Sequence, residues 1–478
     1  MSATQQPQQI AQIYTQDPTV GKIEKIALEG AIAEGPSDAY VAAPRDYYFT
    51  RYSDRKTRDF IFDPAKNPMQ FDQVSTFVVI NQVREMYTRA LNRIAQQGGS
   101  RLAGWQWGAA PITYKIRAGD DANAYYSRDE RVLAFFTFYS TSARKQIYTS
   151  ESFDVVAHEA GHAILDTLKP GFFDSWHPQT GAIHEAFGDL TAIFSAISIP
   201  SLRHNLLVET RGEINNSSFL NKLAEQFGQA ILPKQDFLRN ASSVVKLGEV
   251  SDEVHDLSVV LTGAVYEALI QVTNYELEKN RGTQEPEATL LLTSQKILDL
   301  FLRAILAAPV KDVIFADIAS WMIRLSAPEH TAIIRRAFER RNVPLIFNAD
   351  ALDKAAGLPP AKMMSSANIN HQTCCGTLHK EIGKSMIRAA DKKRARLAAT
   401  VNEPVMSPVL PHSPPAITSS YAGSSVSQSP VTTPMSSMTL NERDIDITPQ
   451  DMERGLTEIV TTYSVTKTYI VPKLRAAP

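Results

Sequence analysis

Two histidines four residues apart lie in an otherwise apolar segment, DVVAHEAGHAIL, and constrain the fold more than any other feature of the chain. On an α-helix, residues separated by four positions share a face, so the imidazoles of His158 and His162 are predicted to lie one above the other. Ser152 can cap the start of this helix. Two imidazoles placed in this way can bind one zinc ion, and Glu159 can then reach a water molecule bound to that ion.

A second segment, GAIHEAFGDL, supplies the third protein ligand that a zinc site with one open position requires. Glu185 and Asp189 are four residues apart on what the pattern predicts to be a second helix. Glu185 would bind the metal, and Asp189 would accept the outer N–H of a ligand histidine and so determine its tautomer. Either segment alone could be a solvated helix face. The two together favour a metal site.

The remaining pattern predicts an α+β protein. Polar residues 1–40 are expected to be loosely ordered, and residues 41–151 contain short aromatic and β-branched strands around one amphipathic helix. Helical patterns dominate residues 152–345. Residues 346–440 include a Ser/Pro-rich stretch expected to be a disordered linker, and the tail at 441–478 has a strand-like composition that could dock a partner.

Composition excludes several classes of protein. A net charge of −2 and a pI near 6.6 provide no overall field that would attract nucleic acid or an anionic membrane. The short basic run at 392–396 is interpreted as a solvated segment. Cys374 and Cys375 are adjacent and cannot join distant segments. Because neither a signal peptide nor a long apolar run is present, we expect a cytoplasmic protein with no membrane contact, although secretion by another route stays open.

The two motifs, HEAGH and GAIHEAFGD, resemble the HExxH and GAxNEAxxD pair of the thermolysin family of gluzincins, with His184 where that family usually has Asn. The resemblance covers roughly residues 70–345. It implies a two-lobed fold with a mixed N-terminal lobe, a helical C-terminal lobe and a zinc site in the cleft between them. His158, His162 and Glu185 would hold the zinc, and Glu159 would be the catalytic base.

Two further segments are similar to functional segments of the family. ANAYYSRDERVLAFF resembles its substrate-binding edge strand, which implies that Asn123 and Ala124 hold an extended peptide by strand addition. VHDLSVVLTGAVYEAL resembles the segment with a second catalytic histidine, here His255, which would donate to the oxyanion. Asp252 is the nearest match for the acid that orients this histidine.

Other positions depart from the family pattern. Trp176 lies where the family has a Tyr that contacts the oxyanion, and Arg203 matches an arginine that contacts the substrate carbonyl. Ala196 falls where a shared calcium carboxylate belongs, so we expect no double calcium site, since calcium needs several oxygens together.

These features predict a zinc-dependent endopeptidase that acts on peptide or protein substrates. The alternative is a catalytically inactive binding protein that retains the metallopeptidase fold, because a fold by itself does not establish an activity. The natural substrate, the cleavage preference, the mode of activation and the oligomeric state stay open.

Overall fold

The computed structural model describes residues 8–28, 32, 41–42, 51–98, 112–175, 177–214, 218–232 and 236–346. The linker expected at 346–440, but for its first residue, and the tail at 441–478 lie outside the described residues, as does Trp176. Within the described part the secondary structure is a mixture of helices and small sheets, in agreement with the α+β class.

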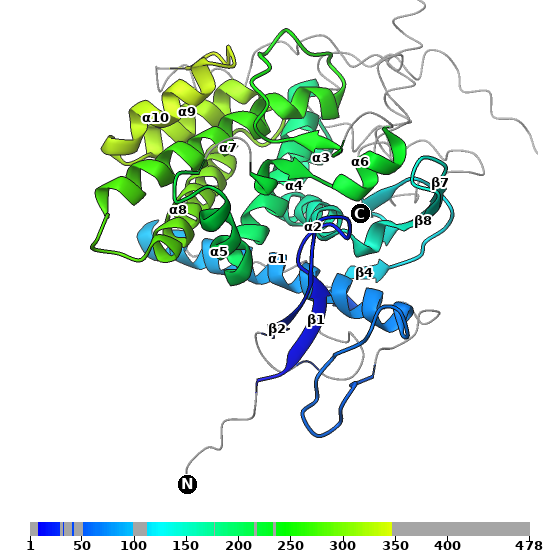
Figure 1. Ribbon diagram of the computed structural model, residues 1–478. Coiled ribbons are helices and arrows are strands. Elements are labelled where there is room, and N and C mark those ends of the chain that lie inside the picture. The colour runs from blue at the N-terminus through cyan, green and yellow to red at the C-terminus, as the bar shows by residue number, and fades with distance from the viewer. Residues whose placement is uncertain are drawn as a thin grey trace, which may run out of the picture. The chain divides into compact units, whose positions relative to one another are not determined.

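A β-hairpin occupies part of the N-terminal segment. β1 (Ile10–Tyr14) and β2 (Ile23–Ala27) pair antiparallel, and the hairpin packs against the long helix α1 (Pro68–Gly98; Figure 1). Ala11 and Ile13 are fully buried, because alternate residues of β1 face the core. The expectation of loose order is therefore wrong for residues 8–28, where a short alternating strand lies within a polar segment.

A four-stranded sheet combines one strand that precedes α1 in the chain with three strands that follow it. Its strand order is β3 (Val41–Ala42), β4 (Ile112–Lys115), β6 (Val132–Phe135) and β5 (Ala124–Ser127). The pairs β3–β4 and β4–β6 are parallel, whereas β5 runs antiparallel to β6. Among the described strands β5 pairs only with β6, so it forms an edge of the sheet.

A separate hairpin, β7 (Thr137–Ser140) and β8 (Lys145–Tyr148), follows this sheet. Helices then dominate: α2 (Phe153–Leu168), α3 (Pro170–Phe173), α4 (Pro178–Ser198), α5 (Pro200–Glu209), α6 (Glu225–Ile231), α7 (Val254–Lys279), α8 (Pro286–Ala307), α9 (Phe315–Leu325) and α10 (Pro328–Glu339). Two short strands, β9 (Lys222–Leu223) and β10 (Arg239–Asn240), pair antiparallel beside them. Several of these helices begin with a proline, whose fixed φ angle suits the first helical position.

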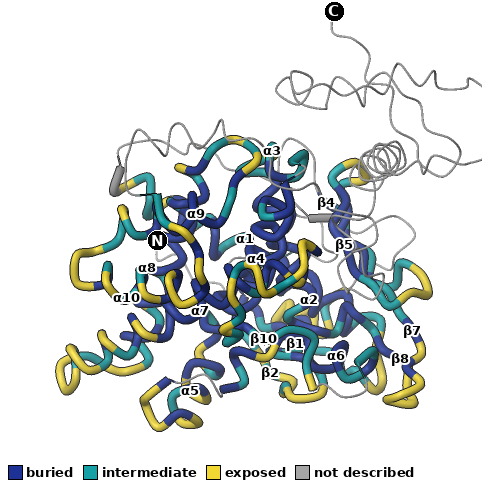
Figure 2. The backbone as a smooth tube through the Cα atoms, turned by 90° about the horizontal axis from the view of Figure 1, so that it is seen from above, coloured by how far each residue is buried: buried dark blue, intermediate teal, exposed yellow. Residues whose placement is uncertain are grey.

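The three helices α2, α4 and α7 form the centre of the fold, with α4 packed against both others. Figure 2 shows buried residues concentrated in the central helices and exposed residues in the loops around them. α7 is long and apolar enough to span a membrane, and so is the bent pair α4 and α5 taken together. Most of the apolar window of α7 is buried inside the protein, so α7 is a core helix.

Candidate metal centre

α2 carries His158, Glu159 and His162, and it is buried along most of its length. Ser152 caps the helix, because its side chain accepts the N–H of Val155.

Two glycines allow α2 to lie close to α4. A Cβ atom on Gly161 would lie 2.6 Å from Oγ1 of Thr191, and one on Gly188 would lie 2.7 Å from the ring of His158. Gly188 therefore allows the backbone of α4 to lie against the imidazole of His158, and Gly161 leaves room on α2 for Thr191 of α4.

This close packing gathers two imidazoles around one carboxylate. Nε2 of His158 lies 3.3 Å from Oε2 of Glu185, and Nε2 of His162 lies 3.6 Å from Oε1 of the same residue. Glu159 is also near, since candidate ligand atoms of His158, Glu159 and His162 lie within 4.8 Å of one another. All four side chains are buried.

The chemistry of this group fits a cation. Nε2 of His158 and both carboxylate oxygens of Glu185 are buried, and none of them makes a hydrogen bond within the described part of the chain. Buried polar atoms without a hydrogen bond cost desolvation energy, which a bound cation would offset. Two imidazole nitrogens and one carboxylate are a donor set typical of zinc sites with an open position.

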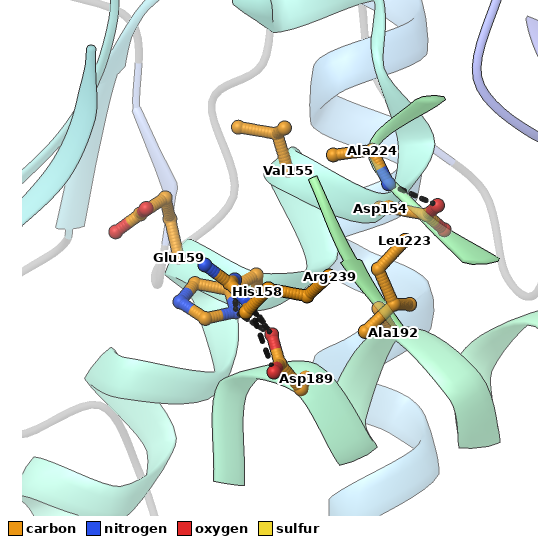
Figure 3. A pocket seen from close by; sticks show the side chains of 9 residues that line it. All are labelled: Asp154, Val155, His158, Glu159, Asp189, Ala192, Leu223, Ala224 and Arg239. Atoms are coloured by element: carbon orange, nitrogen blue, oxygen red, sulfur yellow. Dashed lines mark hydrogen bonds and ion pairs between the residues drawn. The ribbon is translucent and has the colours of Figure 1, made fainter. Parts of the chain in front are cut away.

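The outer nitrogen of His158 is held from the other side. Nδ1 of His158 lies 3.0 Å from Oδ1 of Asp189, one turn beyond Glu185 on α4. Arg239 of β10 donates from Nε to the Asp189 carboxylate at 2.9 Å, and its Nη2 lies 3.2 Å from Nδ1 of His158 (Figure 3). Arg239 could not be predicted from the sequence, because no local pattern relates it to a carboxylate fifty residues earlier.

The outer nitrogen of His162 meets a different partner. Its Nδ1 lies 2.8 Å from Nδ1 of His184, and both rings are fully buried. Burial lowers the pKa of His184 to about 4. His184, the departure from the family pattern, is therefore a direct neighbour of His162.

His255 enters the same group from the start of α7. Its Nε2 lies 3.2 Å from Oε2 of Glu185, and its Nδ1 lies 2.7 Å from Oε1 of Glu253. Asp252, which we expected to orient this ring, is exposed and makes no described contact with it. That expectation is wrong because Glu253 is the N-cap of α7, and its side chain folds back over the first turn.

Charge pairing dominates the electrostatics of the group. Burial lowers the pKa of His158, but the carboxylates of Asp189 and Glu185 outweigh this effect and raise it to about 9. Burial also lowers the pKa of His255, but Glu185 and Glu253 raise it to about 10. Burial lowers the pKa of His162 well below its usual value. Burial raises the pKa of Glu185, but the imidazoles of His255 and His162 hold it well below its ordinary value, so this carboxylate is ionised at neutral pH.

The expected edge strand lies beside the helix of the two histidines, since β5 packs against α2. Ala124 begins β5 and is opposite Phe135 of β6. The carbonyl of Asn123 accepts the N–H of Phe136 and the hydroxyl of Thr149, while its side-chain Oδ1 is buried without a hydrogen bond among the described residues.

Arg203 lies elsewhere. Its Nη1 donates to the carbonyls of Ile197 and Ser198 at 2.8 Å, which caps the C-terminal end of α4. The bend of 92° between α4 and α5 lies where these contacts are made, and the expected substrate contact of Arg203 stays a prediction. Next to the undescribed Trp176, Nδ1 of His177 accepts the N–H of Gln179 and so caps the start of α4.

Fold and site together define a mixed helical and sheet protein with a candidate metal centre of the HExxH type. No protein-family model matches the sequence, and a search of curated proteins finds no match. Among solved structures the chain is similar to the precursor of protealysin, a metalloproteinase from Serratia proteamaculans. The two are 12% identical with a TM-score of 0.36, and the match covers 72% of this chain and 90% of that one. At this level of similarity we base the function on the geometry of the site.

Proposed function

We propose that this protein is a zinc-dependent endopeptidase of the thermolysin-like kind. The observation that carries the proposal is that Nε2 of His158 and Nε2 of His162 face opposite oxygens of the Glu185 carboxylate. These three residues would hold the zinc. A bound zinc ion would supply Lewis acidity, which activates water and polarises a carbonyl group.

Glu159 is the proposed general base. It follows the first ligand histidine on α2 and belongs to the same close cluster. Its carboxylate would accept the proton of the attacking water and then transfer it to the leaving amine of the cleaved peptide.

His255 is the proposed donor to the oxyanion. Its Nδ1 is 2.7 Å from the Glu253 carboxylate, so Nδ1 carries a proton for that contact. Its Nε2 lies 3.2 Å from Oε2 of Glu185, beside the proposed zinc position, so a protonated ring would donate from Nε2 to a negative charge that develops there.

The substrate would lie along β5, which pairs with β6 alone among the described strands; Ala124 begins this strand and Asn123 directly precedes it. A hollow beside Glu159 is lined on one side by the apolar residues Val155, Ala192, Leu223 and Ala224 (Figure 3). The lining also includes the charged residues Asp154, Asp189 and Arg239, and its apolar part would face a small substrate side chain next to the cleaved bond. Arg239 is the arginine close enough to contact the substrate there.

Two substitutions test the proposal. Glu159→Gln keeps the shape of the side chain but removes the base, so the variant should bind one zinc ion per chain and lose peptide hydrolysis. Glu209→Gln, at an exposed position of α5, makes the same chemical change and should leave both unchanged. Full hydrolysis by Glu159→Gln, or no stoichiometric zinc in the wild type, would contradict the proposal.

The third ligand and the type of cleavage need separate measurements. Glu185→Gln should lose stoichiometric zinc, whereas binding retained by this variant and lost by Glu159→Gln would assign Glu159 as the ligand instead. Peptides blocked at both ends should be cleaved, because an endopeptidase needs no free terminus. Unfolded casein that stays intact with zinc present would support the inactive binding protein.

A further inference from the structure

The two candidate ligand histidines have different partners on their outer nitrogens. Nδ1 of His158 faces the carboxylate of Asp189 at 3.0 Å, whereas Nδ1 of His162 faces another imidazole, that of His184, at 2.8 Å. A distance of 2.8 Å between two ring nitrogens requires one proton between them, because two lone pairs or two N–H groups would repel each other.

The position of that proton follows from metal binding, so this inference rests on the proposed function. A histidine that offers the Nε2 lone pair to a metal, and remains neutral, carries its proton on Nδ1. Nδ1 of His162 is then the donor, and Nδ1 of His184 is the acceptor. His184 must in turn be neutral, with its own proton on Nε2.

Within the described part of the chain, the contact with Nδ1 of His162 is the polar contact of the His184 ring. The ring is fully buried and its Nε2 makes no hydrogen bond within the described part of the chain. Phe173 of α3 packs edge-on against it at 5.2 Å, and the ring of His162 lies at 5.0 Å with a tilt of 36°. Its backbone neighbour is Glu185, so the same turn of α4 carries both a candidate ligand and the acceptor for another ligand.

We infer that His184 is a positioning residue that accepts the Nδ1–H of His162 and thereby directs the Nε2 lone pair of His162 toward the metal. Its imidazole is uncharged, in contrast to the carboxylate beside His158. An uncharged acceptor orients His162 without adding a second negative charge behind the ligands, which preserves the Lewis acidity of the metal.

Two substitutions whose side chains branch at the same atom as histidine test whether His184 accepts the proton of His162. Oδ1 of Asn branches from the chain where Nδ1 of His does, so His184→Asn retains an acceptor for His162. His184→Leu places a methyl group there and leaves the Nδ1–H of His162 buried without this partner. Competition with a chromophoric chelator for inorganic zinc should show a zinc dissociation constant ~10–100-fold higher for His184→Leu and much closer to wild type for His184→Asn.

A buried hydrogen bond that involves none of the histidines controls for the general cost of such a change. The hydroxyl of Tyr114 on β4 is buried and donates to the carbonyl of Gln73 at 3.2 Å. Tyr114→Phe should lower the thermal stability of the metal-free protein but leave the zinc dissociation constant unchanged. Equal zinc binding by the wild type, His184→Asn and His184→Leu would overturn the inference.

A measurement on the wild type applies even where His184→Leu does not fold. In the zinc-loaded protein, ¹⁵N shifts of the histidine rings should show Nδ1 of His184 without a proton and Nε2 with one. A proton on Nδ1 of His184 would overturn the inference. Neither readout needs peptide hydrolysis, so a zinc-binding wild type that cleaves no peptide would contradict the proposed function alone.

Discussion

Oε1 of Glu253 lies 2.7 Å from Nδ1 of His255, while Oε2 of the same side chain accepts the backbone N–H groups of His255 and Asp256 at 2.9 Å. One carboxylate therefore starts α7 and orients the imidazole in its first turn. Because the helix cap and the orientation of the ring depend on the same side chain, the position of His255 relative to Glu185 is coupled to the start of α7.

Glu253→Gln should reduce peptidase activity. The amide keeps the size of the side chain but removes one of the two negative charges, those of Glu185 and Glu253, that raise the pKa of His255. We expect kcat/KM to fall ~10-fold or more, though by less than the ~10²–10³-fold typical of losing an oxyanion donor, as in His255→Ala. Asp252→Asn, at the exposed neighbouring position, is the matched control. A loss of activity in Asp252→Asn, without one in Glu253→Gln, would reverse the assignment.

Arg239→Met should weaken zinc binding. Arg239 balances the buried charge of Asp189, which in turn holds His158. Its removal leaves Asp189 with one partner fewer, and we expect the zinc dissociation constant to rise ~10-fold, measured by chelator competition. Arg203→Met should behave differently: it removes the cap of α4 and lowers the melting temperature while zinc affinity stays at the wild-type value. Weaker zinc binding in Arg203→Met than in Arg239→Met would contradict this division.

The hollow beside Glu159 predicts a shift in specificity. Ala192 on α4 lines the hollow, and Ala192→Val would fill part of it. Cleavage of a random peptide library should then move toward smaller side chains next to the cleaved bond. Ala196 lies one turn further along α4 and does not line the hollow, so Ala196→Val should leave the cleavage profile unchanged. An identical profile for both variants would show that substrate side chains do not enter the hollow.

A partly buried glutamate beside a buried aspartate predicts a dependence of stability on pH. Burial, together with the charge of Asp72, raises the pKa of Glu151 from 4.5 to about 8, against the opposing effects of Arg117 and Lys145. The folded-state pKa is raised, so this group's contribution to stability is complete below pH ~4.5 and is lost as pH rises through ~8.

Glu151→Gln stays neutral and should escape this loss. The difference in melting temperature between the variant and the wild type should therefore shift in favour of the variant from pH 5 to pH 9. This shift is equivalent to roughly 1–3 kcal/mol of unfolding free energy. Glu249→Gln, which changes an exposed carboxylate, should show a difference that stays nearly constant with pH. A pH-independent difference for Glu151→Gln would contradict the raised pKa.

Local spacing in the sequence was sufficient to predict which residues share a helix face. His158 and His162 lie one turn apart on α2, and Glu185 and Asp189 lie one turn apart on α4, because the period of an α-helix is a local property. The strands at Ile112–Lys115 and Val132–Phe135 also follow from their apolar and branched residues.

Contacts between distant segments were decided by the tertiary structure alone. Glu253 rather than Asp252 reaches His255, because the geometry of the cap selects one of two adjacent carboxylates. Arg239 reaches Asp189 through the path of the chain between α4 and β10, which no spacing rule describes. His184 was visible only as a departure from a family pattern, and its role depends on how closely two helices pack. Side-chain partners separated by many residues depend on the packing of whole elements, whereas a helix face depends only on its own residues.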